Sequence, residues 1–239
     1  MSTPTDTTLK LGKYLFKGHA IALRGSIRKP YYQELGNHLE ISTYAGSLGL
    51  MRCSNRDFSV SNDIAYESAS TEIVAEQFDG HIFQSIVTAR VENLRIGNRL
   101  TVQEVVCRLR SVYDARDYPQ RVEARILPTG STIKGLRIDG KEQELDLPPA
   151  FFHDEKTQDA FLRGQLDGDP VHYPGRIPEP IYVKDLGTIF YAEWVWAHPQ
   201  ERRRQHLTML RLALGSDLGA DADVGFTDND GSGWPPLGS

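Results

Sequence analysis

Hydrophobic and polar residues alternate along much of this chain with a period of two. Residues 105–113 show the pattern most clearly, because one face of that segment is apolar and the other carries arginines. The apolar face consists of Val105, Cys107, Leu109 and Tyr113, and the opposite face contains Arg108 and Arg110. A period of two with β-branched residues is typical of a strand with one buried face. The segment therefore predicts a half-buried β-strand.

Two similar phrases lie on either side of this strand, Asn-Leu-Arg-Ile-Gly-Asn at 93–98 and Gly-Leu-Arg-Ile-Asp-Gly at 135–140. Each ends in a Gly-Asn or Asp-Gly dipeptide, whose residues tolerate positive φ and reverse the chain as a hairpin. The alternation also predicts strands over 14–27 and 81–94. Together these features indicate antiparallel strands joined by tight turns.

The strongest predicted hairpin lies near the C-terminus, with strands at 186–198 and 204–214 joined by a polar turn. In a register of even parity, Trp196 faces His206 and Trp194 faces Thr208. A shift of one residue would exchange the two faces, so these pairings depend on the register.

The predicted fold class is mainly β, an antiparallel β-sandwich or barrel. One short helix is expected near 154–166, where Asp154 can act as N-cap. Residues 1–10 are expected to be a disordered lead and 11–215 a single β-rich domain. Residues 216–239, rich in Gly, Asp and Ser, are expected to be a disordered, flexible acidic tail.

Charge narrows the range of partners. The net charge of the 239-residue chain is −5, and five of its 32 acidic residues lie in the predicted tail without any Lys or Arg. The remaining 27 acidic residues equal the 27 basic ones, so the body is formally neutral. A neutral body argues against nucleic acid, whose phosphates attract excess positive charge. No apolar run has the length of a membrane span and no signal peptide is visible, so a soluble cytoplasmic protein is expected.

Motifs for known chemistry are missing from the sequence. No histidines form a helical i, i+4 pair and no cysteines have zinc spacing, so no metal or cofactor is predicted. The two cysteines leave a single disulfide open as an alternative. His198 and His206 flank the predicted hairpin turn and, with Glu193, are the candidate catalytic residues if the fold brings them into one cavity.

The aromatic hairpin is the first candidate for binding. Tyr191, Trp194 and Trp196 offer large surfaces with polar groups, although aromatic residues on strands also form cores. Arg202 and Arg203 can bind an anionic segment or can simply form a solvated turn that discourages edge pairing. Trp234, followed by two prolines, resembles the anchor of a docking peptide, with a plain disordered end as the alternative.

Three stretches carry a family resemblance: residues 86–94, 130–140 and 207–212. With these strand-and-turn patterns the chain resembles a set of uncharacterised bacterial β-rich proteins of unassigned function. The resemblance implies an all-β fold and brings no activity or site residues.

Two functional hypotheses follow. The first is a non-enzymatic structural or interaction protein, which self-assembles as an oligomer or binds a protein partner through its strands and the aromatic hairpin. The alternative is an enzyme with a small-molecule pocket at the mouth of a β-barrel. A further possibility is that the acidic tail is an address peptide that directs the body into a larger assembly.

Overall fold

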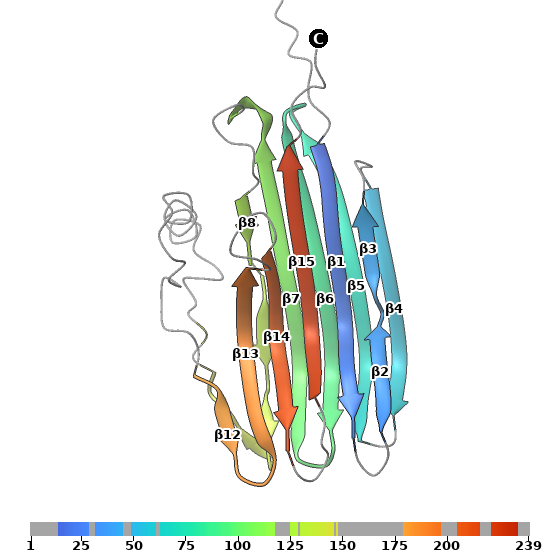
Figure 1. The fold of residues 1–239 in the computed structure, drawn as a ribbon, viewed down its shortest axis with the longest axis vertical. Helices are drawn as coiled ribbons and strands as arrows, with labels where there is room; N and C mark the ends of the chain where they lie inside the picture. The colour runs from blue at the N-terminus through green and yellow to red at the C-terminus, as the bar shows by residue number, and fades with distance from the viewer. Residues whose placement is uncertain are drawn as a thin grey trace, which may run out of the picture.

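The chain forms two antiparallel β-sheets packed face to face, with sheet A in front of sheet B in Figure 1. The computed structural model describes residues 14–28, 32–44, 49–60, 63–117, 125–128, 130–145, 147, 179–196, 205–215 and 221–233. Within these ranges the regular structure is β-strand, apart from one short 3-10 helix, η1 (Ala115–Asp117). The helix expected near 154–166 and the lead over 1–10 lie outside the described residues.

Sheet A has the strand order β12-β13-β14-β15-β1-β2, and β3 pairs with β1 beyond the end of β2. Its strands are β12 (Ile181–Val183), β13 (Gly187–Trp196), β14 (Gln205–Leu214), β15 (Asp221–Gly233), β1 (Tyr14–Ile27), β2 (Gln33–His38) and β3 (Ile41–Tyr44). The first and last parts of the chain therefore meet at the centre of this sheet, where β1 and β15 pair along most of their length.

Sheet B has the order β11-β10-β7-β6-β5-β4, and β8 and β9 also pair with β7. Its strands are β4 (Gly49–Val60), β5 (Ile64–Phe78), β6 (Ile82–Ile96), β7 (Leu100–Asp114), β8 (Arg125–Leu127), β9 (Thr132–Lys134), β10 (Arg137–Ile138) and β11 (Lys141–Glu142). Consecutive long hairpins join β4 to β7, and the predicted Gly-Asn turn lies between β6 and β7.

The core lies between the sheets, where β15 packs on β6 and β7 and β1 packs on β5 and β6. The inward face predicted for 105–113 is confirmed, because Val105, Cys107, Leu109 and Tyr113 are buried. The mainly β fold class is confirmed as a sandwich-like fold of two open sheets, and the described strands do not close into a barrel.

In each sheet the alternation of inward and outward side chains changes phase along a line that crosses the strands. In sheet B, strands β4 to β7 each place two consecutive residues outward on this line, and Asp57 and Asn93 there have φ of 55° and 51°. The outward pairs are Arg56 and Asp57, Glu67 and Ser68, Glu92 and Asn93, and Gln103 and Glu104. In sheet A the matching line places two consecutive residues inward. These inward pairs are Tyr191 and Ala192, Met209 and Leu210, Val224 and Gly225, and Ala22 and Leu23.

The prediction of a flexible tail over 216–239 is wrong for residues 221–233, which form β15 between β14 and β1. Ala222, Val224 and Thr227 are buried in the core, and the outward Asp223 forms an ion pair with Arg24. The polar composition concealed a strand whose outward Asp223 is neutralised by Arg24 of the neighbouring strand β1.

The predicted C-terminal hairpin is present, but its even register is wrong. Trp194 pairs with Leu207 and Trp196 with Gln205, a shift of one residue from the predicted pairs. Ala192, whose φ is 53°, interrupts the ladder and changes the phase of β13 at that point.

Candidate functional site

Of the candidate site residues predicted from the sequence, Tyr191 and Glu193 are the two whose side chains the structure describes. Tyr191 is buried in the core, which agrees with the alternative that aromatic residues of the hairpin pack in the core. Glu193 lies on the outer face of sheet A. Trp194, Trp196 and His206 belong to β13 and β14, but their side chains lie outside the described residues, as do His198, Arg202, Arg203 and Trp234. Convergence of the two histidines with Glu193 therefore stays a prediction.

The outer face of sheet A carries a row of side chains that sequence reasoning missed. Neighbouring strands place one residue each in this row, because their pairing registers align these positions across five strands. From β13 to β2 the row is Phe190, Arg211, Asp223, Arg24 and Asn37. No sequence motif marks it, since its members are brought together only by the register.

Both arginines in the row are held by carboxylates and aromatic rings. Arg24 donates from Nε to Oδ2 of Asp223 at 2.8 Å, and its guanidinium lies 4.2 Å from the centre of the Phe226 ring. Arg211 donates to both oxygens of Glu193 at 2.6 and 2.9 Å. Charge-assisted hydrogen bonds and cation–π contacts fix a guanidinium in one orientation. The row is therefore rigid and pre-organised.

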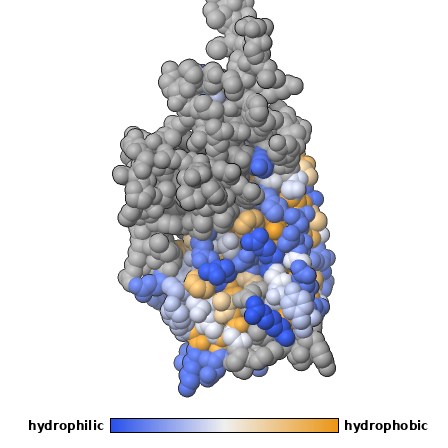
Figure 2. Space-filling model, in the orientation of Figure 1, coloured by the Kyte–Doolittle hydropathy of each residue, from blue (hydrophilic) through white to orange (hydrophobic). Residues whose placement is uncertain are grey.

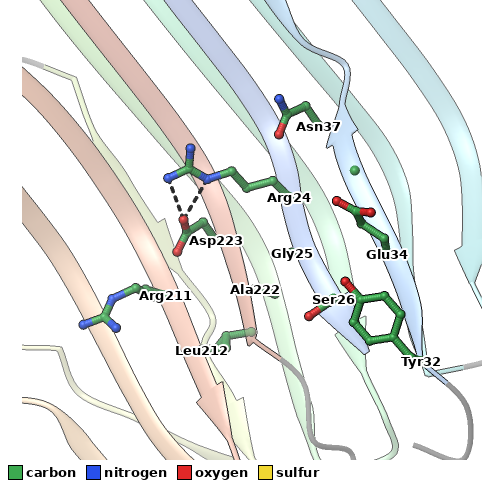
Figure 3. Close-up of a pocket in the computed structure, with 11 residues that line it drawn as sticks. Arg24, Gly25, Ser26, Tyr32, Glu34, Asn37, Arg211, Leu212, Ala222 and Asp223 are labelled. Carbon is green, nitrogen blue, oxygen red and sulfur yellow. Dashed lines mark hydrogen bonds and ion pairs between the residues drawn. The ribbon is translucent and has the colours of Figure 1, made fainter. Parts of the chain in front are cut away.

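Beside this row is an open groove of about 430 Å³. Gly25, Ser26 and Ala222 line its floor. One wall is formed by Tyr32, which precedes β2, and by Glu34 and Asn37 of β2 (Figure 3). The opposite wall is formed by Arg24, Asp223 and Arg211. In Figure 2, the described part of this face shows hydrophilic residues with smaller apolar patches between them. The groove suits a polar ligand.

The second candidate is the edge of sheet B at β4, which pairs with β5 alone among the described strands and forms one border of the molecule in Figure 1. This edge is called the free edge of β4. Three of the four sheet ends are short or broken: β12 has three residues, β11 has two, and β2 is separated from β3 at Leu39, whose φ is 54°. In contrast, β4 has 12 residues. Long unpaired edges present backbone groups that can pair with another chain.

A polar and aromatic cluster joins the two sheets behind this edge. His38 of β2 lies with its ring 4.2 Å from that of Phe58, and Phe58 stacks on Tyr66 at 4.9 Å. Asn55 lies within hydrogen-bond distance of His38 Nε2 at 3.4 Å. Burial lowers the pKa of His38 and raises the pKa of Tyr66 to about 12. These contacts indicate that the cluster contributes to packing between the sheets and that the His38 ring is neutral.

Thiol and metal chemistry are limited in the described structure. Cys53 and Cys107 are both free thiols, so the disulfide left open by the sequence is not formed. Burial raises the pKa of Cys107 to about 12. Among the residues that the structure describes, no three His, Cys, Asp or Glu side chains group to hold a metal ion.

In that same part of the chain, no helix has the length and apolar character needed to cross a membrane.

Fold and surface define the chain as an antiparallel β-sandwich with a polar groove on one outer face and a long free strand edge. The chain belongs to the family of a domain of unknown function (DUF8256), whose model matches residues 14–174. That range includes all of β4 and the β1 and β2 side of the groove, but not Arg211 or Asp223. No curated protein and no solved structure matches the chain significantly.

Proposed function

We propose that this chain is a non-enzymatic interaction protein that self-assembles through the free edge of β4. The observation that carries the proposal is the contrast between the 12-residue β4 and the short or interrupted strands at the other sheet ends. Proteins commonly shorten, break or cover edge strands to prevent pairing between molecules. Among the described residues, no strand pairs with the outer side of the regular segment 49–55 of β4, so this segment is suited to pairing.

The exposed side chains of β4 support the same conclusion. Leu50 and Met51 are 63% and 43% exposed at the beginning of the strand. Beyond Asn55 the edge becomes irregular, because Asn55 Oδ1 accepts the backbone N–H of Arg56 and Asp57 has a φ of 55°. The regular and partly apolar segment is therefore 49–55.

Charge restricts how two copies of β4 can pair. A twofold axis makes the interface isologous, and residues directly opposite in an antiparallel pair lie on the same face. Centring the axis on Arg52 would oppose it to its own copy, and centring it on Ser54 would oppose Arg52 to Arg56. Like charges directly opposite are destabilising. A centre at Cys53 avoids both conflicts, because Arg52 then faces Ser54.

Substitutions at Ser54 test this arrangement by sedimentation velocity and light scattering over a concentration series. Ser54 is exposed, so its replacement leaves the core unchanged. Ser54→Lys places a second cation opposite Arg52 and is expected to weaken the dimer about tenfold, whereas Ser54→Glu strengthens it. Ser59→Lys is the matched control, because Ser59 is exposed on the same strand beyond the irregular segment. A wild-type chain that stays monomeric at all concentrations contradicts the proposal.

Cys53 provides a separate test of the register. Opposed residues in an antiparallel pair have Cα atoms about 4.5–5.5 Å apart, within the range that a disulfide spans. Diamide, which accepts the two electrons and two protons of the thiols, should therefore cross-link Cys53 between copies. Cys53→Ser should abolish the covalent dimer on a non-reducing gel and leave association intact. Association without cross-linking would contradict the register centred at Cys53.

A further inference from the structure

The groove on the outer face of sheet A is separate from the β4 edge, and we propose that it binds a neutral saccharide. Its volume of about 430 Å³ lies within the roughly 300–1,000 Å³ that is usual for ligand sites. The groove lies on sheet A and the β4 edge on sheet B, so saccharide binding does not depend on dimerisation.

The charges of the groove balance. The lining contains two cationic residues, Arg24 and Arg211, and two acidic ones, Asp223 and Glu34. Because Arg211 also binds Glu193 outside the lining, the groove has no excess of positive charge. A site for a phosphate or another strongly charged ligand gains affinity from an excess of one sign, which this lining lacks. A neutral ligand with many polar groups fits the balance better.

The Arg24–Asp223 pair offers a donor and an acceptor side by side. Both Nε and Nη2 of Arg24 lie 2.8 Å from Oδ2 of Asp223 (Figure 3). Among the described residues, Nη1 of Arg24 and Oδ1 of Asp223 take part in no hydrogen bond. A hydroxyl both donates and accepts, so two neighbouring sugar hydroxyls can use this pair.

The opposite wall adds polar groups of both kinds. Glu34 supplies an acceptor, and Asn37, which donates from Nδ2 to Glu40, can accept through Oδ1. The Ser26 hydroxyl on the floor both donates and accepts. Tyr32 is 69% exposed at the rim, where its ring offers a flat apolar surface next to a hydroxyl. One face of a sugar ring is relatively apolar and its edge is polar, which matches this arrangement.

The floor of the groove argues against a peptide or an apolar metabolite. It is the face of a sheet, and the backbone groups of β1 and β15 are already paired with each other. A peptide main chain therefore finds no strand edge to extend there, as it would in strand addition. Sites for apolar small molecules are lined mainly by hydrophobic side chains, which this groove lacks.

Isothermal titration calorimetry of the full chain tests the proposal. The probes are cellohexaose, mannohexaose, maltohexaose and chitohexaose, with hexagalacturonic acid, pyrophosphate and a mixed-charge peptide as other ligand classes. At least one neutral saccharide is expected to bind with a Kd below about 1 mM. No binding by any neutral saccharide, or binding only of the other classes, overturns the proposal.

Variants at Tyr32 locate the site. Tyr32→Ala should weaken saccharide binding about tenfold, while Tyr32→Phe keeps the ring and should stay within about twofold of wild type. Tyr182→Ala is the matched control, because Tyr182 is 78% exposed on β12, away from the groove. Equal binding by the Tyr32→Ala and Tyr182→Ala variants overturns the assignment. Unchanged binding by the Ser54→Lys variant is expected, which separates this result from self-assembly.

Discussion

Gly225→Ala tests the packing of the two sheets most directly. Gly225 has a φ of 65° and lies in β15, where the inward and outward pattern changes phase. A Cβ added there would lie 3.1 Å from Cβ of Cys107 and 3.2 Å from Cγ1 of Val105. Carbon atoms in good contact are about 3.5–4.0 Å apart, so sheet B must shift by a few tenths of an ångström to make room.

The expected loss has two parts. A left-handed conformation costs a residue with a Cβ about 1–2 kcal/mol. Overpacking of a tight core costs about 1–3 kcal/mol more, and burying one methyl group returns about 0.8 kcal/mol. The free energy of unfolding should therefore fall by about 1–4 kcal/mol, compared with the roughly 5–15 kcal/mol typical of a folded domain.

Urea unfolding followed by far-ultraviolet circular dichroism measures this loss. Gly140→Ala is the matched control, since its φ is 76° and an added Cβ meets nothing within 4 Å. The control should lose only the backbone part, about 1–2 kcal/mol. Equal losses in the two variants would refute close packing between β15 and β7, and an unchanged Gly225→Ala variant would refute the placement of β15 in the core.

Three further predictions concern the core and its ionisable groups. Gly18→Ala brings a Cβ to 2.7 Å from Cγ2 of Val87 and should lower the free energy of unfolding by about 1–3 kcal/mol. In a double-mutant cycle with Val87→Ala, the two losses of stability should be less than additive. Burial lowers the pKa of His38 below its ordinary 6.5, so the unfolded state takes up the proton first. The free energy of unfolding should therefore decline as the pH falls through about 6.5, and urea midpoints of His38→Gln should show a smaller decline. Cys107 is fully buried with a pKa of about 12, so mass spectrometry should find its alkylation by iodoacetamide limited by global unfolding.

The parts of the fold that local patterns determine could be predicted from the sequence. The strand expected over 14–27 is β1 with the same bounds. The Asp-Gly turn expected after Ile138 is also present, with φ of 51° at Asp139 and 76° at Gly140. These predictions succeeded because alternation and positive-φ dipeptides act within a few residues.

The predictions of the hairpin register and of a disordered C-terminal tail were wrong because both features depend on pairing between distant parts of the chain. The pairing of β13 with β14 keeps one register on both sides of Ala192, and the alternation within each strand does not specify which residues pair across the hairpin. In β15 the apolar residues Ala222, Val224 and Phe226 alternate as in a strand. The Asp, Gly and Ser content of the same segment is typical of a disordered tail, which is what was predicted. Long-range pairing with β1 and β14 stabilises this strand, and no local pattern reveals such pairing.

The phase change in sheet A links the core to the groove. Two consecutive inward residues, Val224 and Gly225, leave Asp223 and Phe226 as successive outward positions on β15. Arg24 can then bind the carboxylate of Asp223 while its guanidinium lies over the ring of Phe226. A strand of unbroken alternation would place every second residue outward, and Phe226 would turn toward the core. The conformation of one buried glycine therefore places the Phe226 ring against Arg24, in the wall of the groove that Arg24 and Asp223 form.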